Sequence, residues 1–191
     1  MPGKITAALA FMLVAMFGLT ASANDFQPEI EKFMKQEITG FLSDPAVVSA
    51  VKAQNAKHVS LSEAEIDTLD KTWRAEAKSG GGAMVDAALA NDLSKLLKAK
   101  KEAAGGKVAE MFIMDNKGLN VGQSDMTSDY MQGDEAKWQK SFGKGAGAMF
   151  IDEVEFDEST KAFLSQASLT IVDEAGNPIG AITVGINVEK L

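Results

Sequence analysis

The chain has 191 residues and contains no cysteine, one histidine and one tyrosine. Without cysteine it forms no disulfide and offers no thiolate for catalysis or metal binding. The lone His58 cannot complete a zinc site by itself, and we expect it to be a solvated side chain in a polar connection. No serine lies in an elbow motif either, so we expect a non-enzyme without metal or cofactor. A metal-dependent carboxylate site is the one enzymatic alternative that stays open.

Basic residues are also scarce, with 19 Lys and Arg against 27 Asp and Glu and a formal net charge of −8. Such a chain repels nucleic acid and anionic lipid surfaces, so we expect no nucleic-acid partner. Four acidic residues lie between Asp125 and Glu135, but their spacing does not match a calcium-binding EF-hand loop.

Only one long apolar run is present, and it lies at the N-terminus. Lys4 precedes the apolar stretch 5–19, and Ala21-Ser22-Ala23 follows with the small residues that signal peptidase recognises. We therefore predict a cleaved signal peptide over 1–23, a mature chain that begins at Asn24, and a periplasmic location. The alternative is a retained N-terminal anchor, although the apolar run is short for a membrane span.

Residues 24–106 form the predicted helical region. Apolar residues at three- and four-residue steps indicate a helix over 25–42, and Pro45 opens a second one. Ser62 and Glu65 make a capping box for a third helix, in which Trp73 is expected to be a core residue. A fourth helical stretch runs from Val85 to the glycines 105–106, with a possible break at Asn91-Asp92.

Residues 107–191 change to the period of two that is typical of strands. Short turns join successive strands, which makes them antiparallel neighbours. We therefore predict an α+β fold with N-terminal helices packed on a five-stranded antiparallel sheet, its strands at 108–114, 119–124, 148–156, 162–173 and 179–188.

The two faces of the last strand differ in character. Ile182, Val184 and Ile186 share one face, which we expect to pack on the N-terminal helices. The opposite face carries Thr183 and Asn187, where small and polar side chains leave room for a ligand. In the strand 148–156, Asp152 is expected to share an apolar face with Phe150, Val154 and Phe156. It would pair there with a ligand cation or a backbone donor, or be solvated at a sheet edge.

Two aromatic residues lie in the segment that connects the second and third strands. Tyr130 stands in a polar loop beside Asp129, and Trp138 lies on a short helix predicted over 133–142. Amphipathic rings in such a setting favour a small-ligand pocket, and the alternative for each ring is plain core packing.

The order of these features resembles the extracytoplasmic Cache, or PAS-like, sensor domains of bacterial signalling proteins. The features are Asp115-x-x-Gly118 after a strand, the Tyr130 loop, the Trp138 helix and a final hairpin, Gly-Asn-Pro-Ile-Gly-Ala-Ile-Thr-Val-Gly-Ile-Asn. The resemblance covers most of 24–191 as one domain and is strongest from 108 to 188. It implies a pocket for an amino acid, a small carboxylate or a related metabolite, lined by Tyr130 and Trp138.

The sequence departs from the family pattern at one site position, and the resemblance also implies signalling partners. Asn187 occupies the position where many members carry an Asp that meets a ligand amine, so carboxylate or neutral ligands remain open. The chain ends at Leu191, where family members continue into a membrane helix, so we expect signalling through a separate histidine kinase, cyclase or chemoreceptor. The alternative function is a protein–protein adaptor or inhibitor module with a vestigial pocket.

Overall fold

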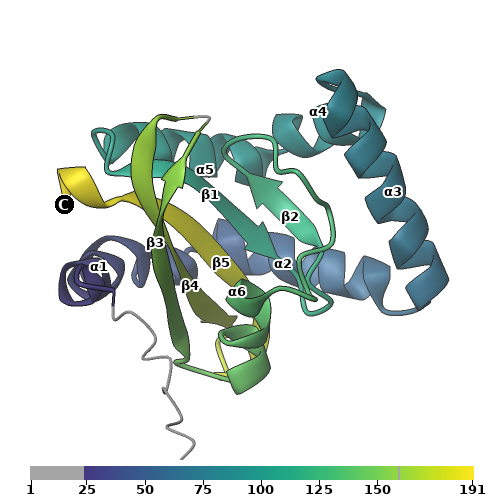
Figure 1. Ribbon diagram of the computed structural model, residues 1–191. Coiled ribbons are helices and arrows are strands. Elements are labelled where there is room, and N and C mark those ends of the chain that lie inside the picture. Colours follow the sequence, from purple (N-terminus) through teal and green to yellow (C-terminus); the bar gives the residue numbers. More distant parts are fainter. Residues whose placement is uncertain (1–23, 159) are drawn as a thin grey trace, which may run out of the picture.

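The structure is a computed structural model that describes residues 24–158 and 160–191 (Figure 1). The predicted signal peptide, 1–23, lies outside the described residues. In the described parts, no helix is long and apolar enough to cross a membrane.

One five-stranded antiparallel sheet forms the centre of the molecule (Figure 1). Its order is β2-β1-β5-β4-β3, so the last strand lies between the first and the fourth. Each strand lies within two residues of its predicted bounds, and the predicted α+β class is confirmed. The strands are β1 Val108–Met114, β2 Asn120–Gln123, β3 Met149–Asp157, β4 Ala162–Val172 and β5 Pro178–Asn187.

The helical region contains five α-helices, which are α1 Gln27–Phe33, α2 Pro45–His58, α3 Glu63–Ser79, α4 Ala83–Ala90 and α5 Asp92–Ala103. Between α1 and α2 the chain forms a π-helical turn, Met34–Ile38, and a 3-10 turn, Phe41–Ser43. The predicted capping box of Ser62 and Glu65 starts α3. Asn91 ends α4 and caps α5 through the Ser94 amide, so the predicted break lies there.

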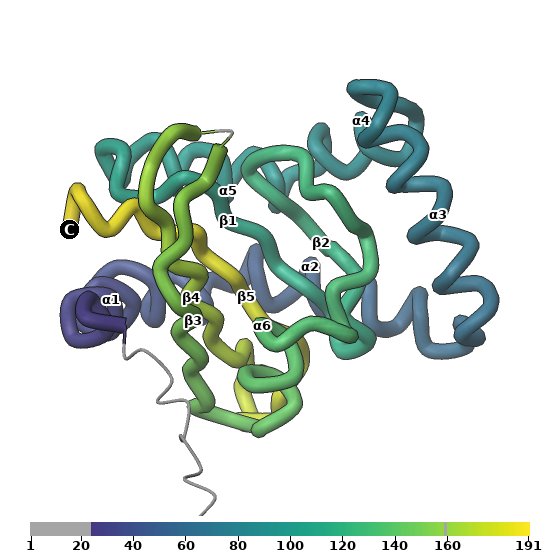
Figure 2. Tube along the Cα trace, in the orientation of Figure 1, coloured from purple at the N-terminus to yellow at the C-terminus, as the bar shows by residue number. Residues whose placement is uncertain are grey.

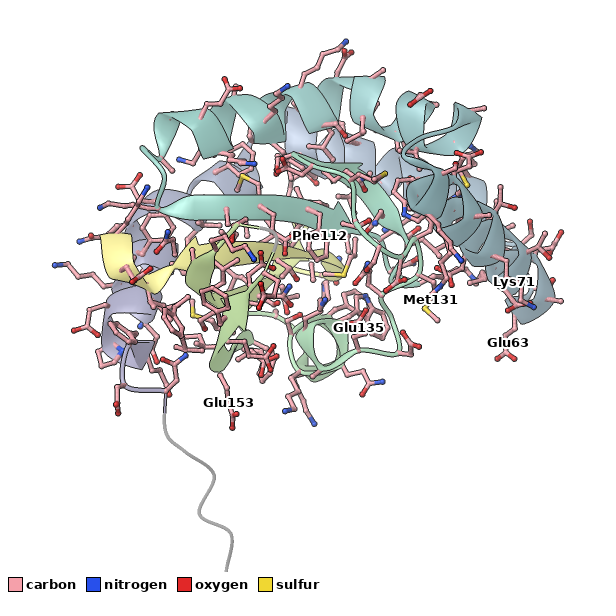
Figure 3. The ribbon with its side chains drawn as sticks, turned by 45° about the horizontal axis from the view of Figure 1, so that its top comes forward. Glu63, Lys71, Phe112, Met131, Glu135 and Glu153 are labelled. Carbon is pink, nitrogen blue, oxygen red and sulfur yellow. The ribbon has the colours of Figure 1, made fainter. Side chains whose placement is uncertain are left out.

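One face of the sheet, here called the helix face, packs on helices α1, α2 and α5. Ile182, Val184 and Ile186 are fully buried in this cluster together with residues of those helices. The prediction for this face is confirmed, because the alternating apolar side chains of β5 must be removed from water on one side. Figure 3 shows α5 above the sheet and the α6 segment, around Ala136–Gln139, below it.

The opposite face of the sheet, here called the distal face, carries the short helix α6 and the 3-10 turn Phe142–Lys144. Trp138 and Phe142 pack there against Phe112, Met114 and Ala181. Helices α3 and α4 lie to one side, beyond β2 (Figure 1).

A second apolar cluster, here called the side cluster, joins α3 and α4 to β2. It is built from Trp73, Val85, Leu119 and Tyr130, and Trp73 is fully buried as predicted. At the other end of the molecule, the start of α1 and the C-terminal turn Val188–Lys190 lie together (Figure 2).

Candidate functional site

A cavity of about 310 Å³ lies between the distal face, β3 and the start of α6. We call it the distal cavity. Its walls come from β1, β3, β4 and the α6 segment, so residues far apart in sequence meet there. They are Glu110, Glu135, Ala136, Lys137, Asp152, Glu153, Glu155, Phe156, Asp157, Leu164 and Gln166.

The charge of the distal cavity is strongly one-sided, with six carboxylates against a single ammonium group, that of Lys137. Lys137 is already engaged, because its Nζ lies 2.9 Å from Glu135 and 3.3 Å from the Gln132 side-chain oxygen. The same Nζ lies 5.5 Å from the centre of the Phe112 ring. A negative potential therefore fills the cavity, and its one cation is partly neutralised.

Glu110 lies on the inner wall of this cavity. It stands on the distal face of β1, and its carboxylate accepts a hydrogen bond of 3.1 Å from Gln166 on β4. Burial raises the pKa of the Glu110 carboxyl above its ordinary value, while the Gln166 hydrogen bond and the charge of Lys137 lower it by less. A cation placed beside Glu110 would favour its ionised form.

A band of polar residues crosses the middle of the distal face beside Glu110. Phe112 on β1 pairs with Gln123 on β2 and with Thr183 on β5, and Thr183 pairs in turn with Ser168 on β4. Paired residues of neighbouring strands share a face, so these side chains form one row. The Ser168 and Thr183 hydroxyls are fully buried and lie 2.9 Å apart, within hydrogen-bond distance.

Tyr130 and Asp129 are held by α3. The Tyr130 ring stacks on Trp73 with 5.4 Å between centroids, and the Asp70 side chain accepts from the Tyr130 backbone amide at 3.0 Å. Asp129 forms an ion pair with Arg74. Burial and the nearby Asp115 raise the pKa of the Tyr130 hydroxyl well above its usual range. Both residues therefore belong to the contact between the loop and α3.

Trp138 lies on the distal face but in a different cluster from Tyr130. Its ring packs at 4.9 Å from the Phe142 ring, and its Nε1 donates to the Asp115 carbonyl at 3.2 Å. Lys137 and Ala136, its neighbours on α6, line the distal cavity. The two rings thus pack in separate clusters, their predicted pairing around one ligand stays a prediction, and Trp138 lies next to a wall of the cavity.

Asp152 lines the distal cavity, but not for the predicted reason. The register of β3 shifts between Ile151 and Val154, so the strand contains a bulge at Asp152. The Asp152 carbonyl accepts hydrogen bonds from Asn24 at 2.6 Å and from Ser165 at 2.8 Å. Because a bulge shifts the alternation of side chains, Phe150 and Val154 lie on opposite faces, and the predicted shared apolar face of β3 is wrong.

Thr183 and Asn187 lie on the distal side of β5 as predicted from alternation, but they differ in role. Thr183 is buried in the polar band. Asn187 accepts a hydrogen bond from the Glu189 amide at 3.1 Å and so caps the C-terminal turn. A ligand-binding role for Tyr130, Trp138, Asp129, Asp152, Thr183 and Asn187 stays a prediction.

His58 is the clearest correction to the sequence analysis. It is buried at the end of α2, with 5% of its surface exposed, and its Nδ1 lies 2.9 Å from the Asp115 carboxylate. Asp115 is wholly buried and also accepts from Gln54 and from the backbone amides of Lys117 and Leu119. His58 is therefore part of a buried polar network that fixes the Asp115-x-x-Gly118 turn.

Of the wall residues, only Asp152 was predicted from the sequence as a site residue, and two of the others show why. Glu110 is the only charged residue in the apolar strand Val108–Met114, and that isolation is a signal that can be read from the sequence. Lys137 carries no comparable signal, because a lysine on a short helix is ordinary.

Comparison with known proteins gives structural neighbours only. No family model matches the sequence, and no curated protein matches it. Similar solved structures include the sensor domain of the V. cholerae histidine kinase DctB, at 14% identity and a TM-score of 0.39. The E. coli DcuS sensor domain matches at 13% identity and a TM-score of 0.39, with 65% of this chain and 92% of that chain covered.

The ligand-binding domain of the Campylobacter jejuni chemoreceptor Tlp3, in complex with 4-methylisoleucine, matches at 14% identity with a TM-score of 0.41. The alignments cover 86% of this chain and 58% of the DctB domain, and 83% of this chain and 60% of the Tlp3 domain. This chain thus spans about three fifths of those two structures. At such scores the function must be argued from the site itself. The similar structures are sensor or ligand-binding domains of histidine kinases and a chemoreceptor.

Proposed function

We propose that this chain is a non-catalytic sensor domain that binds a small amine-bearing metabolite in the distal cavity. The observation that carries the proposal is the charge of that cavity, which sets six carboxylates against one lysine. The carboxylates come from β1, from the start of α6 and from β3, so they surround the space on several sides. An ammonium group inside it meets favourable charge from the β1, β3 and α6 walls.

The same charge distribution disfavours a dicarboxylate ligand. A carboxylate entering the cavity would need a cation, and Lys137 already lies between Glu135 and Gln132. Recruiting Lys137 would leave the Glu135 carboxylate without its ion pair. Of the ligand classes that the sequence resemblance implies, amino acids fit best, because each brings its own ammonium group, and other small amines share that feature.

Thermal unfolding with a panel of metabolites tests this proposal. We expect simple amines and amino acids to raise the midpoint by about 5–10 °C at a concentration near 100 times Kd, and succinate or malate to leave it unchanged. Glu110→Gln removes a charge-assisted hydrogen bond and should weaken amine binding by about 10- to 100-fold.

Glu63→Gln is the matched control for this experiment. Glu63 is exposed at the start of α3, far from Glu135 and the distal cavity (Figure 3). Its substitution should leave the amine shift intact. A dicarboxylate that stabilises the wild-type protein while every amine fails would contradict the proposed ligand class.

Glu110 also predicts a pH dependence. Because its pKa is raised in the folded protein, the native state holds this proton more tightly than the unfolded chain. The contribution of Glu110 to stability is therefore lost as pH rises above the ordinary value of 4.5. Glu110→Gln removes this loss, so the variant should gain stability relative to wild type between pH 4 and pH 8. Urea unfolding at both pH values measures the difference, and a constant difference would refute the assignment.

The proposed location is the periplasm, with the bound state passed to a membrane kinase, cyclase or chemoreceptor. A ligand that binds one arrangement of the α6 segment better than another shifts the population toward it. The surface around α6 and β3 would then differ between the free and bound states.

The adaptor alternative rests on a separate groove of about 490 Å³. It lies between α1, the end of α5 and the C-terminal Leu191, and its floor includes Phe33, Ile38 and Val108. Co-purification of one membrane protein without any small ligand would favour this function. If a substitution of Phe33 abolishes co-purification of that partner and leaves the thermal shift by amines unchanged, the groove is the partner's binding site.

A further inference from the structure

Gln123 is a buried side chain without a hydrogen-bond partner. Only 1% of its surface is exposed, and among the described residues neither its Oε1 nor its Nε2 finds a partner. A buried amide normally pairs both groups, because leaving them unpaired forfeits the hydrogen bonds that water supplied. Gln123 therefore destabilises the free protein.

Gln132 is a buried glutamine whose side-chain amide has hydrogen-bond partners. It is 2% exposed, its Nε2 donates to the Asp129 carbonyl at 2.9 Å, and its Oε1 accepts from Lys137 at 3.3 Å. The two glutamines have the same chemistry and the same burial. Gln123 ends β2 and Gln132 lies in the following loop, and only the Gln132 amide has hydrogen-bond partners within the protein.

The strand register places Gln123 close to Glu110, a wall residue of the distal cavity. Gln123 pairs with Phe112 across β1 and β2, and Glu110 lies two residues before Phe112 on the same face. Gln123 and Glu110 are thus diagonal neighbours, whose Cβ atoms lie about 7–8 Å apart in such sheets. Phe112 is adjacent to both, directly opposite Gln123 and two residues after Glu110, and the Lys137 Nζ lies 5.5 Å from the centre of its ring.

We propose that Gln123 is a ligand-binding residue, and that its amide pairs with a neutral polar group of the ligand. This inference rests on the proposed function and extends it. The ligand carries an ammonium group for Glu110 and, a few bonds away, a hydroxyl or carboxamide for Gln123. An amide offers both donors and an acceptor, so it suits a group that donates and accepts at once. The unpaired amide lowers the stability of the free protein and provides specificity on binding.

The first test is the stability of the ligand-free protein after refolding from denaturant. Gln123→Met keeps the length of the side chain and removes both unpaired groups, so the midpoint of thermal unfolding should rise by about 2–6 °C. Gln132→Met, the matched control, removes two formed hydrogen bonds and should lower the midpoint by a similar amount. If Gln123→Met lowers the midpoint as Gln132→Met does, the amide is satisfied within the folded protein and the inference is overturned.

The second test compares two amines of equal length, 4-aminobutan-1-ol and pentylamine, by isothermal titration. Wild type should bind the hydroxylated amine at least tenfold more tightly than pentylamine, and Gln123→Met should remove that preference while still binding pentylamine. Equal preference in wild type and Gln123→Met would overturn the ligand contact and leave the proposed function standing. If wild type binds neither these amines nor any other of the metabolite panel, the proposed amine class fails and the inference fails with it.

Discussion

Replacing Asp115 with alanine should lower the free energy of unfolding by about 3–5 kcal/mol. The carboxylate is fully buried, and four donors converge on it, from Gln54, His58 and the Lys117 and Leu119 amides, at 2.8 to 3.0 Å. Alanine would leave the His58 ring and the Lys117 and Leu119 amides without this acceptor, while Gln54 keeps the Leu119 and Asn120 carbonyls. Urea unfolding gives the change directly, and the thermal midpoint should fall by about 10 °C or more.

Asp67→Ala is the control for this result. Asp67 also pairs with a cation, Lys71, at 2.6 Å, but it lies on the exposed face of α3 with 59% of its side chain accessible. Its removal should change stability by about 0.5 kcal/mol or less, because exposed ion pairs contribute little. The loss of unfolding free energy for His58→Ala should lie between those of Asp115→Ala and Asp67→Ala, since three of the four donors to Asp115 keep their acceptor. Equal losses for Asp115→Ala and Asp67→Ala would refute the buried network.

Asp115→Ala should also weaken amine binding. The Asp115 carbonyl accepts a hydrogen bond from the Trp138 indole. Trp138 is part of α6, and its neighbours Lys137 and Ala136 form a wall of the distal cavity. A turn that loses its side-chain hydrogen bonds holds this carbonyl less firmly. The expected signature is weaker binding even in solutions where the variant is fully folded.

The second large effect is expected at Trp73. Its side chain is fully buried in the side cluster, stacks on Tyr130 and donates from Nε1 to the Thr127 carbonyl at 2.9 Å. Trp73→Ala creates a large cavity and should lower the free energy of unfolding by about 3–5 kcal/mol. Because Trp73 holds the loop that contains Thr127 and Tyr130, backbone hydrogen exchange should rise there first.

Trp73→Phe separates packing from hydrogen bonding. Phenylalanine retains most of the apolar contact but leaves the Thr127 carbonyl without its donor, so a smaller loss of about 1–3 kcal/mol is expected. If Trp73→Ala and Trp73→Phe are equally destabilising, the hydrogen bond rather than burial dominates at this position. That outcome would contradict the core role of Trp73.

The strands could be predicted closely because alternation and short turns are local signals. The period of two in β5 identified both its buried face and its polar face. The capping box at Ser62 and the break at Asn91 were equally local, since each depends on residues three positions apart.

The errors come from contacts between distant segments. His58 pairs with Asp115, 57 residues later, and nothing in the polar sequence around His58 indicates that partner. The contacts of Tyr130 with Asp70 and Trp73 on α3 could not be predicted either, because these residues lie about 60 positions earlier in the chain, while its ligand-binding role stays a prediction. The bulge in β3 depends on Asn24 and Ser165, and it moves Val154 to the helix face.

The strand order has a consequence for how the chain reaches this structure. Strands β1 and β2 form one hairpin and β3 and β4 another, and only β5, inserted between β1 and β4, connects the two. Until β5 is in place, each hairpin therefore has an unpaired edge and exposed apolar side chains. The five-stranded sheet cannot form before β5 has been synthesised, and the exposed hairpins favour aggregation until then.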